Sequence, residues 1–431
     1  MSKWNKISIG EFIDFNPSES IKKGTIARKI PMDKLGTFQR KINGSELSEY
    51  SSGPKFRNGD TLVAKITPCL ENGKTALVDI LNDKEVAFGS SEFIVLRENK
   101  NSDKKFIYYL SRSPLFRNKA ISCMEGTSGR KRVNEGALKT QEILVPDLPI
   151  QQKIASVLSA LDDKIELNNR INAELEAMAK TLYDYWFVQF DFPNVENKPY
   201  KTSGGKMVYN ETLKREIPEG WEVTVFNDWI NDTKSGDWGK EAIEGNYTER
   251  VYCIRGADIN GINGKGEVKA PERFILKNNS SKKLIPNDFV VEISGGSPVQ
   301  STGRIALITE ITLERFDTDI ICSNFCKAVS IKNEKYIYNF KQEWQRLYDA
   351  GVFFGFEGKT SGIKNFLFDS FMNSYSIVLP KKEIVEKYYE FAKLIDKKIQ
   401  SNLKQNQELS ALRDWLLPML MNGQVKVGML D

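Results

Sequence analysis

The sequence contains no histidine, and this absence excludes several classes of catalytic site. Ser–His–Asp and Cys–His catalysis, HExxH zinc proteases and histidine-ligated metal centres all require an imidazole side chain. Two signatures that need no histidine are also missing. The sequence has no GxxxxGK[ST] phosphate-binding loop and no Asn/Asp-Pro-Pro-aromatic element of a methyltransferase. Any chemistry in this chain would have to use carboxylate, lysine, tyrosine or cysteine side chains.

Cysteine is scarce, and long apolar runs are absent. The 431 residues include five cysteines, none of them in a CxxC pattern. Cys322 and Cys326 lie four residues apart in an apolar stretch, and we predict that they fill the core of a protein kept in a reducing compartment. The N-terminus has no apolar signal segment, and the longest apolar run, residues 415–421, is too short to span a bilayer. We therefore expect a cytoplasmic protein without a membrane partner.

The charge balance is mildly basic. Sixty-two lysines and arginines against 57 acidic residues give a net charge of +5. This falls short of the strong excess typical of small nucleic-acid-binding domains, although local basic patches could still bind DNA. The length predicts two or three domains, each long enough to bury its own core.

The chain contains two copies of one sequence pattern. ILVP at 143–146 matches IVLP at 377–380, an offset of 234 that holds without a gap for the next 40 residues. Upstream, KFRNGDTLVAKI matches KLIPNDFVVEI at an offset of 228, GKTALV matches GRIALI at 230, and SEF matches SNF at 232. The first strand of each copy opens on a tryptophan, Trp4 and Trp221, at an offset of 217. Because the offset grows only forwards, we infer an internal duplication whose second copy gained short loop insertions.

Each copy has two parts. The first part carries short runs of β-branched and aromatic residues, such as TLVAKI and FVVEIS, which predict strands; helices are expected at 104–119 and 335–349. The second part has helical spacing of apolar residues and predicts a helix of about 50–55 Å. The predicted segments are a first domain at 1–147, a helix at 148–190, a linker at 191–216, a second domain at 217–381 and a helix at 382–425. The expected fold is α+β, with two similar α/β domains separated by two long antiparallel helices.

The apolar stripe of each helix is narrow, so the two helices should pack on each other as a pseudo-twofold pair. Asparagines stand at matching positions of both stripes. We predict buried amide pairs that fix the register at a cost in stability; the alternative is a solvated face. The predicted residues of the helix pair or of a partner interface are Ile154, Leu158, Leu161, Ile165, Asn168, Asn172, Leu175, Phe391, Ile395, Ile399, Asn402, Asn406, Leu409 and Leu416.

A loop rich in glycine, serine and threonine recurs before the last strand of each copy, at 125–134 and 357–365. Small residues expose backbone N–H groups and the neighbouring basic residues add charge, which suits phosphate and base-edge contacts; the alternative is a solvated polar turn. Loops at 65–74 and 294–304 share this character more weakly. The candidate DNA-binding residues are Lys65, Lys74, Thr127, Ser128, Arg130, Lys131, Arg132, Asn134, Ser297, Gln300, Arg304, Lys359, Thr360, Ser361, Lys364 and Asn365.

One catalytic alternative involves Asp258, Glu267 and Lys269, which imitate the Asp…Glu-x-Lys pattern of metal-dependent nucleases. Such triplets arise by chance in a chain with this many glutamates and lysines, and the first copy has no equivalent. The duplicated features are structural, so we predict no catalytic site and no metal site in this chain.

The run LPIQQKIASVLSALDDKIELNNRINAELEAMAKTLYDYWFVQFDFP at 148–193 resembles the central region of type I restriction–modification specificity subunits. NKPYKTSGGKMVYN followed by IPEGW at 217–221 resembles the opening of their second target recognition domain. The likeness covers nearly the whole chain. The second copy departs from the central motif, because Lys381-Lys-Glu replaces its proline and glutamine pattern.

The resemblance implies two target recognition domains, each reading one half of a bipartite, asymmetric site in double-stranded DNA. It also implies that the helices dock two modification (methyltransferase) subunits, to which ATP-dependent restriction subunits add. S-adenosylmethionine, ATP and Mg²⁺ would then be bound by the partners and no cofactor by this chain. Two heads on a rigid spacer predict half-sites about one helical turn apart, roughly 34–36 Å. The alternatives are a coiled-coil scaffold without sequence-specific DNA binding, an enzyme in its own right, and a solitary specificity-like chain with a different partner.

Overall fold

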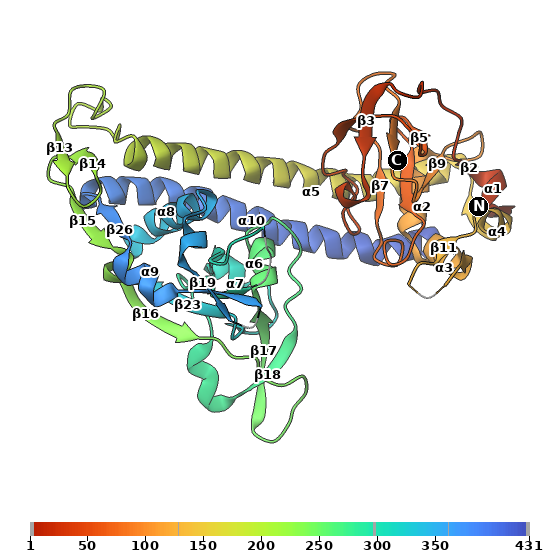
Figure 1. Cartoon of the computed structure of the whole chain (residues 1–431). Helices are drawn as coiled ribbons and strands as arrows, with labels where there is room; N and C mark the ends of the chain where they lie inside the picture. The colour runs from red at the N-terminus through yellow and green to blue at the C-terminus, as the bar shows by residue number, and fades with distance from the viewer. Residues whose placement is uncertain (1–3, 128, 296–298, 361, 428–431) are drawn as a thin grey trace. The chain divides into compact units, whose positions relative to one another are not determined.

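The computed structural model describes residues 4–127, 129–295, 299–360 and 362–427, with the backbone alone at 359 and 360. The chain mixes helices and strands and divides into two compact units (Figure 1). Residues 1–166 and 408–431 form unit 1, and residues 167–407 form unit 2. No helix in these described ranges is long and apolar enough to cross a membrane.

Unit 1 contains two four-stranded sheets and two strand pairs. One sheet has the order β2 (Asp14–Phe15), β9 (Phe93–Arg97), β6 (Thr61–Ala64), β7 (Thr75–Leu77). The other has the order β4 (Glu46–Glu49), β3 (Ile26–Ile30), β8 (Ala87–Gly89), β5 (Lys55–Phe56). The antiparallel pairs are β1 (Trp4–Ser8) with β12 (Glu142–Pro146), and β10 (Met124–Glu125) with β11 (Arg132–Val133).

Short helices cover these sheets, and one predicted helix proves to be two. The short helices are α1 (Ile9–Phe12), η1 (Met32–Lys34), α2 (Lys104–Arg112), α3 (Pro114–Ser122) and α4 (Glu135–Thr140). The prediction of one helix at 104–119 is wrong because Ser113, which precedes a proline, is extended at ψ 154°. Pro114 then starts α3 at the one helical position where its missing N–H costs nothing.

Unit 2 repeats this arrangement with longer connections. Its four-stranded sheet has the order β16 (Ile230–Ser235), β23 (Cys326–Ile331), β19 (Phe289–Glu292), β21 (Ile305–Leu307). Two three-stranded sheets have the orders β18 (Glu272–Leu276), β17 (Tyr247–Ile254), β22 (Ile320–Cys322), and β20 (Ser294–Gly295), β25 (Ile363–Phe366), β24 (Glu357–Thr360). Two antiparallel pairs are β15 (Glu222–Val225) with β26 (Ser376–Leu379), and β13 (Met207–Asn210) with β14 (Arg215–Pro218).

The helices of unit 2 include the predicted one at 335–349. The short helices are η3 (Phe226–Trp229), α6 (Gly256–Ile262), η4 (Lys277–Lys282), α7 (Glu310–Leu313), η5 (Glu334–Tyr336), α8 (Ile337–Asp349), η6 (Val352–Phe356) and α9 (Phe368–Ser374). The prediction of an unstructured linker at 191–216 is only partly right. Residues 207–218 form the β13–β14 hairpin, and Phe192 stacks between Tyr200 and Trp221 at centroid distances of 4.6 and 5.0 Å.

The sheet orders support the inferred duplication. The order β2-β9-β6-β7 in unit 1 corresponds to β16-β23-β19-β21 in unit 2, with every neighbouring pair antiparallel. The parallel pair β3–β8 likewise corresponds to β17–β22. The repeat matches Asp60 to Asp288 immediately before β6 and β19, and both carboxylates are 1% exposed. Asp60 binds Arg97 and Asp288 binds Lys234, so the same buried acid is neutralised in both units.

Two long helices contribute residues to both units. α5 spans Leu148–Tyr183 and continues as a π-helical turn, η2 (Asp184–Val188), so the predicted helix at 148–190 is two residues too long. α10 spans Lys382–Met421, and its predicted end at 425 is four residues too late. Pro418 lies in the last turn, where few later N–H groups depend on the helix continuing, and Gly423 follows with φ +70°.

Each unit has its own apolar core. In unit 1, α2 and the sheet pack on the first turns of α5 through Ile154 and Leu158, and on the last turns of α10 through Leu417 and Leu420. In unit 2, an aromatic core surrounds Trp344 and reaches Tyr388 on α10. Cys322 and Cys326 are each 1% exposed, which confirms the prediction that they fill the core.

Candidate DNA interface and the helix pair

The two loops nominated in the first copy lie against each other. Residues 126–131 connect β10 to β11. The N–H of Thr67 donates to the carbonyl oxygen of Lys131 at 3.0 Å, and the N–H of Val133 donates to that of Lys65 at 2.9 Å. Two segments that the sequence suggested separately therefore form one surface of unit 1.

The end of this hairpin presents unpaired positive charge. Thr127, Arg130 and Lys131 are exposed. Within the described part of the chain, neither Arg130 nor Lys131 forms an ion pair. Ser128, another predicted contact, lies outside the described residues. Arg130 and Lys131 are thus available to a phosphate without first losing an internal partner.

Other predicted contacts on this surface already have partners. The Arg132 guanidinium donates to both carboxylate oxygens of Glu92 at 2.7–3.1 Å, and these bonds raise the pKa of Arg132 and lower that of Glu92. Lys65 pairs with Glu135 at 3.3 Å. Both cations would have to share or exchange a carboxylate in order to bind DNA.

Asn134 and Lys74 hold the backbone in place. The Asn134 side chain caps α4 by accepting from the N–H of Ala137 at 3.0 Å, and it donates to Glu125 at 2.9 Å. Lys74 Nζ donates to the carbonyl oxygen of Met32 at 3.0 Å. These contacts give both side chains a structural role.

The two loops nominated in the second copy also meet. β20 pairs with β25, which brings the segment 294–304 beside the hairpin at 357–366. Ser294 Oγ donates to Asn365 Oδ1 at 2.6 Å, and Gln300 is exposed. Of the other predicted contacts, Ser297, Ser361 and the side chains of Lys359 and Thr360 lie outside the described residues.

The structure does not support a free DNA-binding role for Arg304 and Lys364. Arg304 forms two hydrogen bonds to Glu292, at 2.6 and 2.8 Å, and its side chain is 17% exposed. Lys364 pairs with Glu357 at 3.1 Å and is 13% exposed. Both cations bind carboxylates inside unit 2, so they would have to leave these partners in order to bind DNA.

The predicted amide pairs are present between α5 and α10 in unit 2. Asn168 Nδ2 donates to Asn406 Oδ1 at 2.9 Å, and Asn402 Nδ2 donates to Asn172 Oδ1 at 2.8 Å. Asn168, Asn172 and Asn402 are at most 6% exposed, so the solvated alternative is wrong for them. The repeat exchanges the two pairs, because it maps Asn168 on Asn402 and Asn172 on Asn406. The two helices are therefore antiparallel here and related by a local pseudo-twofold axis.

Apolar residues continue this contact in each unit. In unit 2, Ile395, Ile399 and the half-buried Leu175 and Phe391 pack around Ala179, as predicted. In unit 1, Ile154 and Leu158 are buried and Leu416 packs against the same core. The remaining predicted positions are half-buried, namely Leu161, Ile165 and Leu409.

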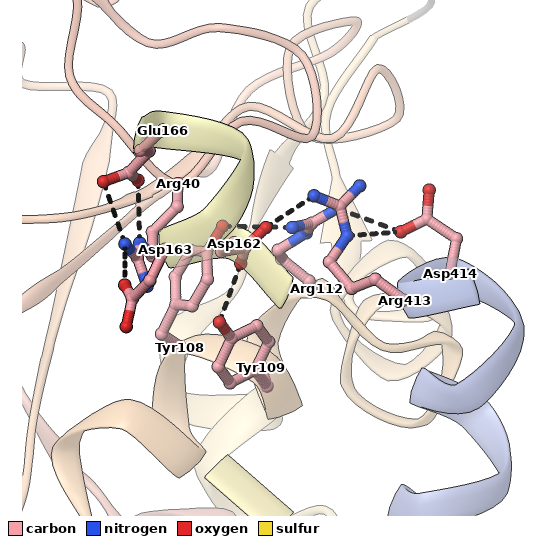
Figure 2. A network of polar contacts seen from close by, with 9 residues as sticks. All are labelled: Arg40, Tyr108, Tyr109, Arg112, Asp162, Asp163, Glu166, Arg413 and Asp414. Carbon is pink, nitrogen blue, oxygen red and sulfur yellow. Dashed lines mark hydrogen bonds and ion pairs between the residues drawn. The ribbon is translucent and has the colours of Figure 1, made fainter. Parts of the chain in front are cut away.

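A buried polar network joins α5 to α10 in unit 1 (Figure 2). Arg413 Nη1 donates to Asp162 Oδ1 at 2.6 Å, and the Tyr109 hydroxyl donates to Asp162 Oδ2 at 2.7 Å. Arg413 also contacts Asp414 at 2.8 Å. Burial alone would lower the pKa of Arg413, but the bonds to Asp414 and Asp162 raise it. Burial, followed by the charge of Asp162, raises the pKa of Tyr109.

A second arginine binds two neighbouring carboxylates of α5 (Figure 2). Arg40 is 8% exposed, and it donates to Asp163 Oδ1 at 2.5 Å and to Glu166 Oε1 at 3.0 Å. Gln151, also on α5 and 1% exposed, donates to the carbonyl oxygens of Asn101 and Pro146. These contacts fix the strand-rich part of unit 1 on α5.

Comparison with known proteins shows which family the chain resembles. A family model described as "Type I restriction modification DNA specificity domain" matches residues 1–177. The type I restriction enzyme MjaIX specificity subunit of Methanocaldococcus jannaschii is 27% identical over 325 residues, which cover 75% of this chain and 69% of that protein. The HindI specificity subunit of Haemophilus influenzae is 24% identical over 481 residues, covering 99% of this chain and 100% of that protein. Over most of its length the chain is similar to the specificity subunits of type I restriction enzymes.

A solved structure shares the fold of this chain. The type I restriction–modification S subunit from M. genitalium has a TM-score of 0.54 and 16% identity, and the match covers 99% of this chain and 97% of that one. The similarity to curated specificity subunits supports a specificity role over the scaffold alternative, and over an enzyme acting by itself. Among the described residues, no group of histidine, cysteine or acidic side chains could hold a metal ion.

Sequence reasoning missed several residues that shape unit 1. The spacing of residues gave no partner for Asp162, since Arg413 lies 251 residues away in sequence. It also did not single out Gln151, which is the buried one of the two adjacent glutamines in the run that resembles the family. Its helical periodicity gave the face of α5, but an error of one residue turns the side chain by about 100°.

Proposed function

We propose that this chain is the non-catalytic DNA-specificity subunit of a type I restriction–modification complex, and that each unit reads one half of a bipartite, asymmetric site in double-stranded DNA. Two modification subunits would dock on the long helices and ATP-dependent restriction subunits would join them. S-adenosylmethionine, ATP and Mg²⁺ would bind those partners.

The observation that carries the proposal is a paired loop surface repeated on the same topology. In each unit, the segment that follows the central strand β6 or β19 meets a hairpin from before the last strand. The topology repeats but the side chains do not. Arg130 and Lys131 are exposed in unit 1, while Lys364 is held inside unit 2. Equivalent frames with different side chains suit two half-sites of different sequence.

Exposed apolar residues on the helices support two docking positions. Met178 on α5 is 53% exposed in unit 2, and Leu412 on α10 is 43% exposed in unit 1. The 234-residue repeat makes these two positions equivalent. Two equivalent apolar positions outside the helix contact match two copies of one partner.

A base-resolution methylome tests the DNA part of the proposal. Cells carrying this chain with its neighbouring modification subunits are compared with cells that lack only this chain. We expect a bipartite motif with a fixed gap that disappears on deletion. Arg130→Gln combined with Lys131→Gln should then weaken or relax one half of the motif; equal loss at both halves would contradict the two-reader arrangement.

Native mass spectrometry tests the docking part. Met178→Glu and Leu412→Glu should each reduce the complex to one modification subunit, and the double variant should bind none. Ala173→Glu, on an exposed position of α5, is the matched charge control. Full stoichiometry in the double variant would show that the partners dock elsewhere.

A further inference from the structure

A cavity in unit 2 has a composition that DNA recognition does not explain. Its volume is about 180 Å³, and it lies between the end of α5, the β13–β14 hairpin, α8 and β26. Its wall includes Trp221, Trp229 and Phe187, which are apolar and aromatic, and two arginines, Arg215 and Arg346.

The charges around the cavity do not balance. Arg346 donates to both oxygens of Glu343, at 2.6 and 2.9 Å, and the Tyr183 hydroxyl donates to the same carboxylate at 3.0 Å. The charge of Glu343 is therefore already balanced by Arg346. Arg215 forms no ion pair within the described part of the chain. The cavity wall thus carries one positive charge without a counter-ion.

Two N–H groups at the cavity also lack acceptors. Arg215 Nε and Trp229 Nε1 are buried without a hydrogen-bond partner in the described chain, and Trp229 is only 7% exposed. The guanidinium lies over the ring of Phe190, 4.7 Å from its centroid. Burial, and then the nearby charge of Arg346, lower the pKa of Arg215. Buried donors of this kind are costly unless an acceptor reaches them.

From these observations we propose that the cavity binds a carboxylate monoanion attached to a small apolar body. The carboxylate completes the hydrogen bonds of Arg215 and Trp229 Nε1, and the aromatic wall covers the apolar part. A cavity of about 150 Å³ holds a body of benzene size, so benzoate is a suitable probe. The carboxylate belongs either to a free small molecule or to an acidic group of a partner subunit.

Benzoate and benzamide, which have the same shape but differ in charge, test the site. The full chain is titrated with each by ligand-observed NMR and by thermal unfolding. We expect benzoate to bind and to raise the melting temperature, and benzamide to bind at least about tenfold more weakly, because the charge-assisted hydrogen bonds are lost. Equal binding of the two probes, or no binding of benzoate, would overturn the proposal.

Variants separate a ligand site from a structural arginine. Arg215→Gln should abolish the benzoate response while leaving the melting temperature of the free chain unchanged or higher, because it removes an unpaired buried charge. Trp229→Phe keeps the aromatic body and should weaken benzoate several-fold. Lys214→Gln is the matched control, since this neighbouring cation is 73% exposed and should leave binding unchanged. A lower melting temperature for Arg215→Gln with benzoate binding intact would make Arg215 structural and overturn the proposal.

The assembled complex distinguishes the two sources of the carboxylate, and only this step depends on the proposed function. Benzoate that binds the isolated chain but not the chain in complex with modification subunits would place a partner's acidic group in the cavity. Benzoate that binds both equally would leave the cavity to a free small molecule. In either case the site itself is established by the isolated chain, whatever DNA the complex reads.

Discussion

The two units satisfy the same aspartate of the repeat in different ways. In unit 1, Asp162 receives Arg413 and Tyr109, one on each carboxylate oxygen. In unit 2, its equivalent Asp396 receives Lys341 at 2.7 Å on one oxygen, and the other oxygen has no partner in the described chain. Ala179 is the equivalent of Arg413 in the repeat, so the charged contact of unit 1 is replaced by apolar packing in unit 2.

This difference shows that equivalent residues of a duplicated segment can have different interaction partners. The aspartate recurs because it stands on the repeated helix, whereas Arg413 comes from the other helix of the pair. Lys341 is 28% exposed and Arg413 is 8% exposed, so water can replace the partner of Asp396 more easily than that of Asp162. The same substitution should therefore have unequal effects in the two units.

The largest effect is expected from Asp162→Asn. The change keeps the shape of the side chain but removes the buried counter-ion of Arg413, whose other ion pair in the described chain is with the exposed Asp414. We expect a cost of about 3 kcal/mol in the free energy of unfolding. Asp396→Asn should cost only about 1 kcal/mol, because Lys341 can turn to solvent. Denaturant unfolding, with hydrogen exchange to assign each loss to its unit, measures both. Equal losses would show that the two aspartates have the same role after all.

The centre of the helix pair offers an intermediate and symmetric test. Asn402→Leu leaves the Asn172 oxygen without its donor and should cost about 1–3 kcal/mol. Adding Asn172→Leu removes both polar groups, so much of that stability should return. A double-mutant cycle in the full chain measures the coupling between the two amides. A stabilising effect of the single variant would mean that this amide pair is no more than a tolerated defect.

A third test compares the two hairpins. Arg130→Gln and Lys131→Gln should each lower the slope of log affinity against log salt by about 1, because each removes one phosphate contact. Lys364→Gln should leave that slope unchanged and lower the stability of unit 2 by about 1 kcal/mol, since it breaks the ion pair with Glu357. DNA binding by the assembled complex at several salt concentrations distinguishes these outcomes. A reduced slope for Lys364→Gln would show that this lysine contacts DNA phosphate after all.

The parts of the fold that could be predicted are those that depend on the spacing of residues along the sequence. The duplication, both long helices and the asparagine pairs follow from spacing, because a helical face repeats every three or four residues. Pro114 signals the helix break at Ser113, but the apolar pattern on either side favoured one continuous helix in the prediction. The β13–β14 hairpin was hidden by a composition that suggests a linker.

The site was harder to predict because a basic residue looks the same whether or not a carboxylate lies beside it. Arg304 and Arg130 both follow a glycine in a polar loop. Only the pairing of β19 with β21 brings Glu292 beside Arg304, whereas Arg130 forms no ion pair with the part of the chain that the structure describes. Sequence spacing selected loops that prove to lie together in each copy, but it could not separate internal ion pairs from free charge.

The smallest effect is expected for the cysteines, and it tests a difference between the units. Burial raises the pKa of the Cys253 and Cys322 thiols in unit 2 to about 12, whereas Cys69 in unit 1 is half-exposed. At pH 8 a thiol of pKa about 12 is ionised to about one part in ten thousand, and only the thiolate reacts quickly with iodoacetamide. Cys123 in unit 1 and Cys326 in unit 2 are also buried, so they should react slowly as well. Intact mass spectrometry of the native chain should therefore show a single fast adduct, which peptide mapping should assign to Cys69, and five adducts after unfolding. A rapid second adduct at Cys322 would show that the core of unit 2 opens far more readily than its packing implies. The free energies of unfolding compared above would then have to be measured for that unit alone.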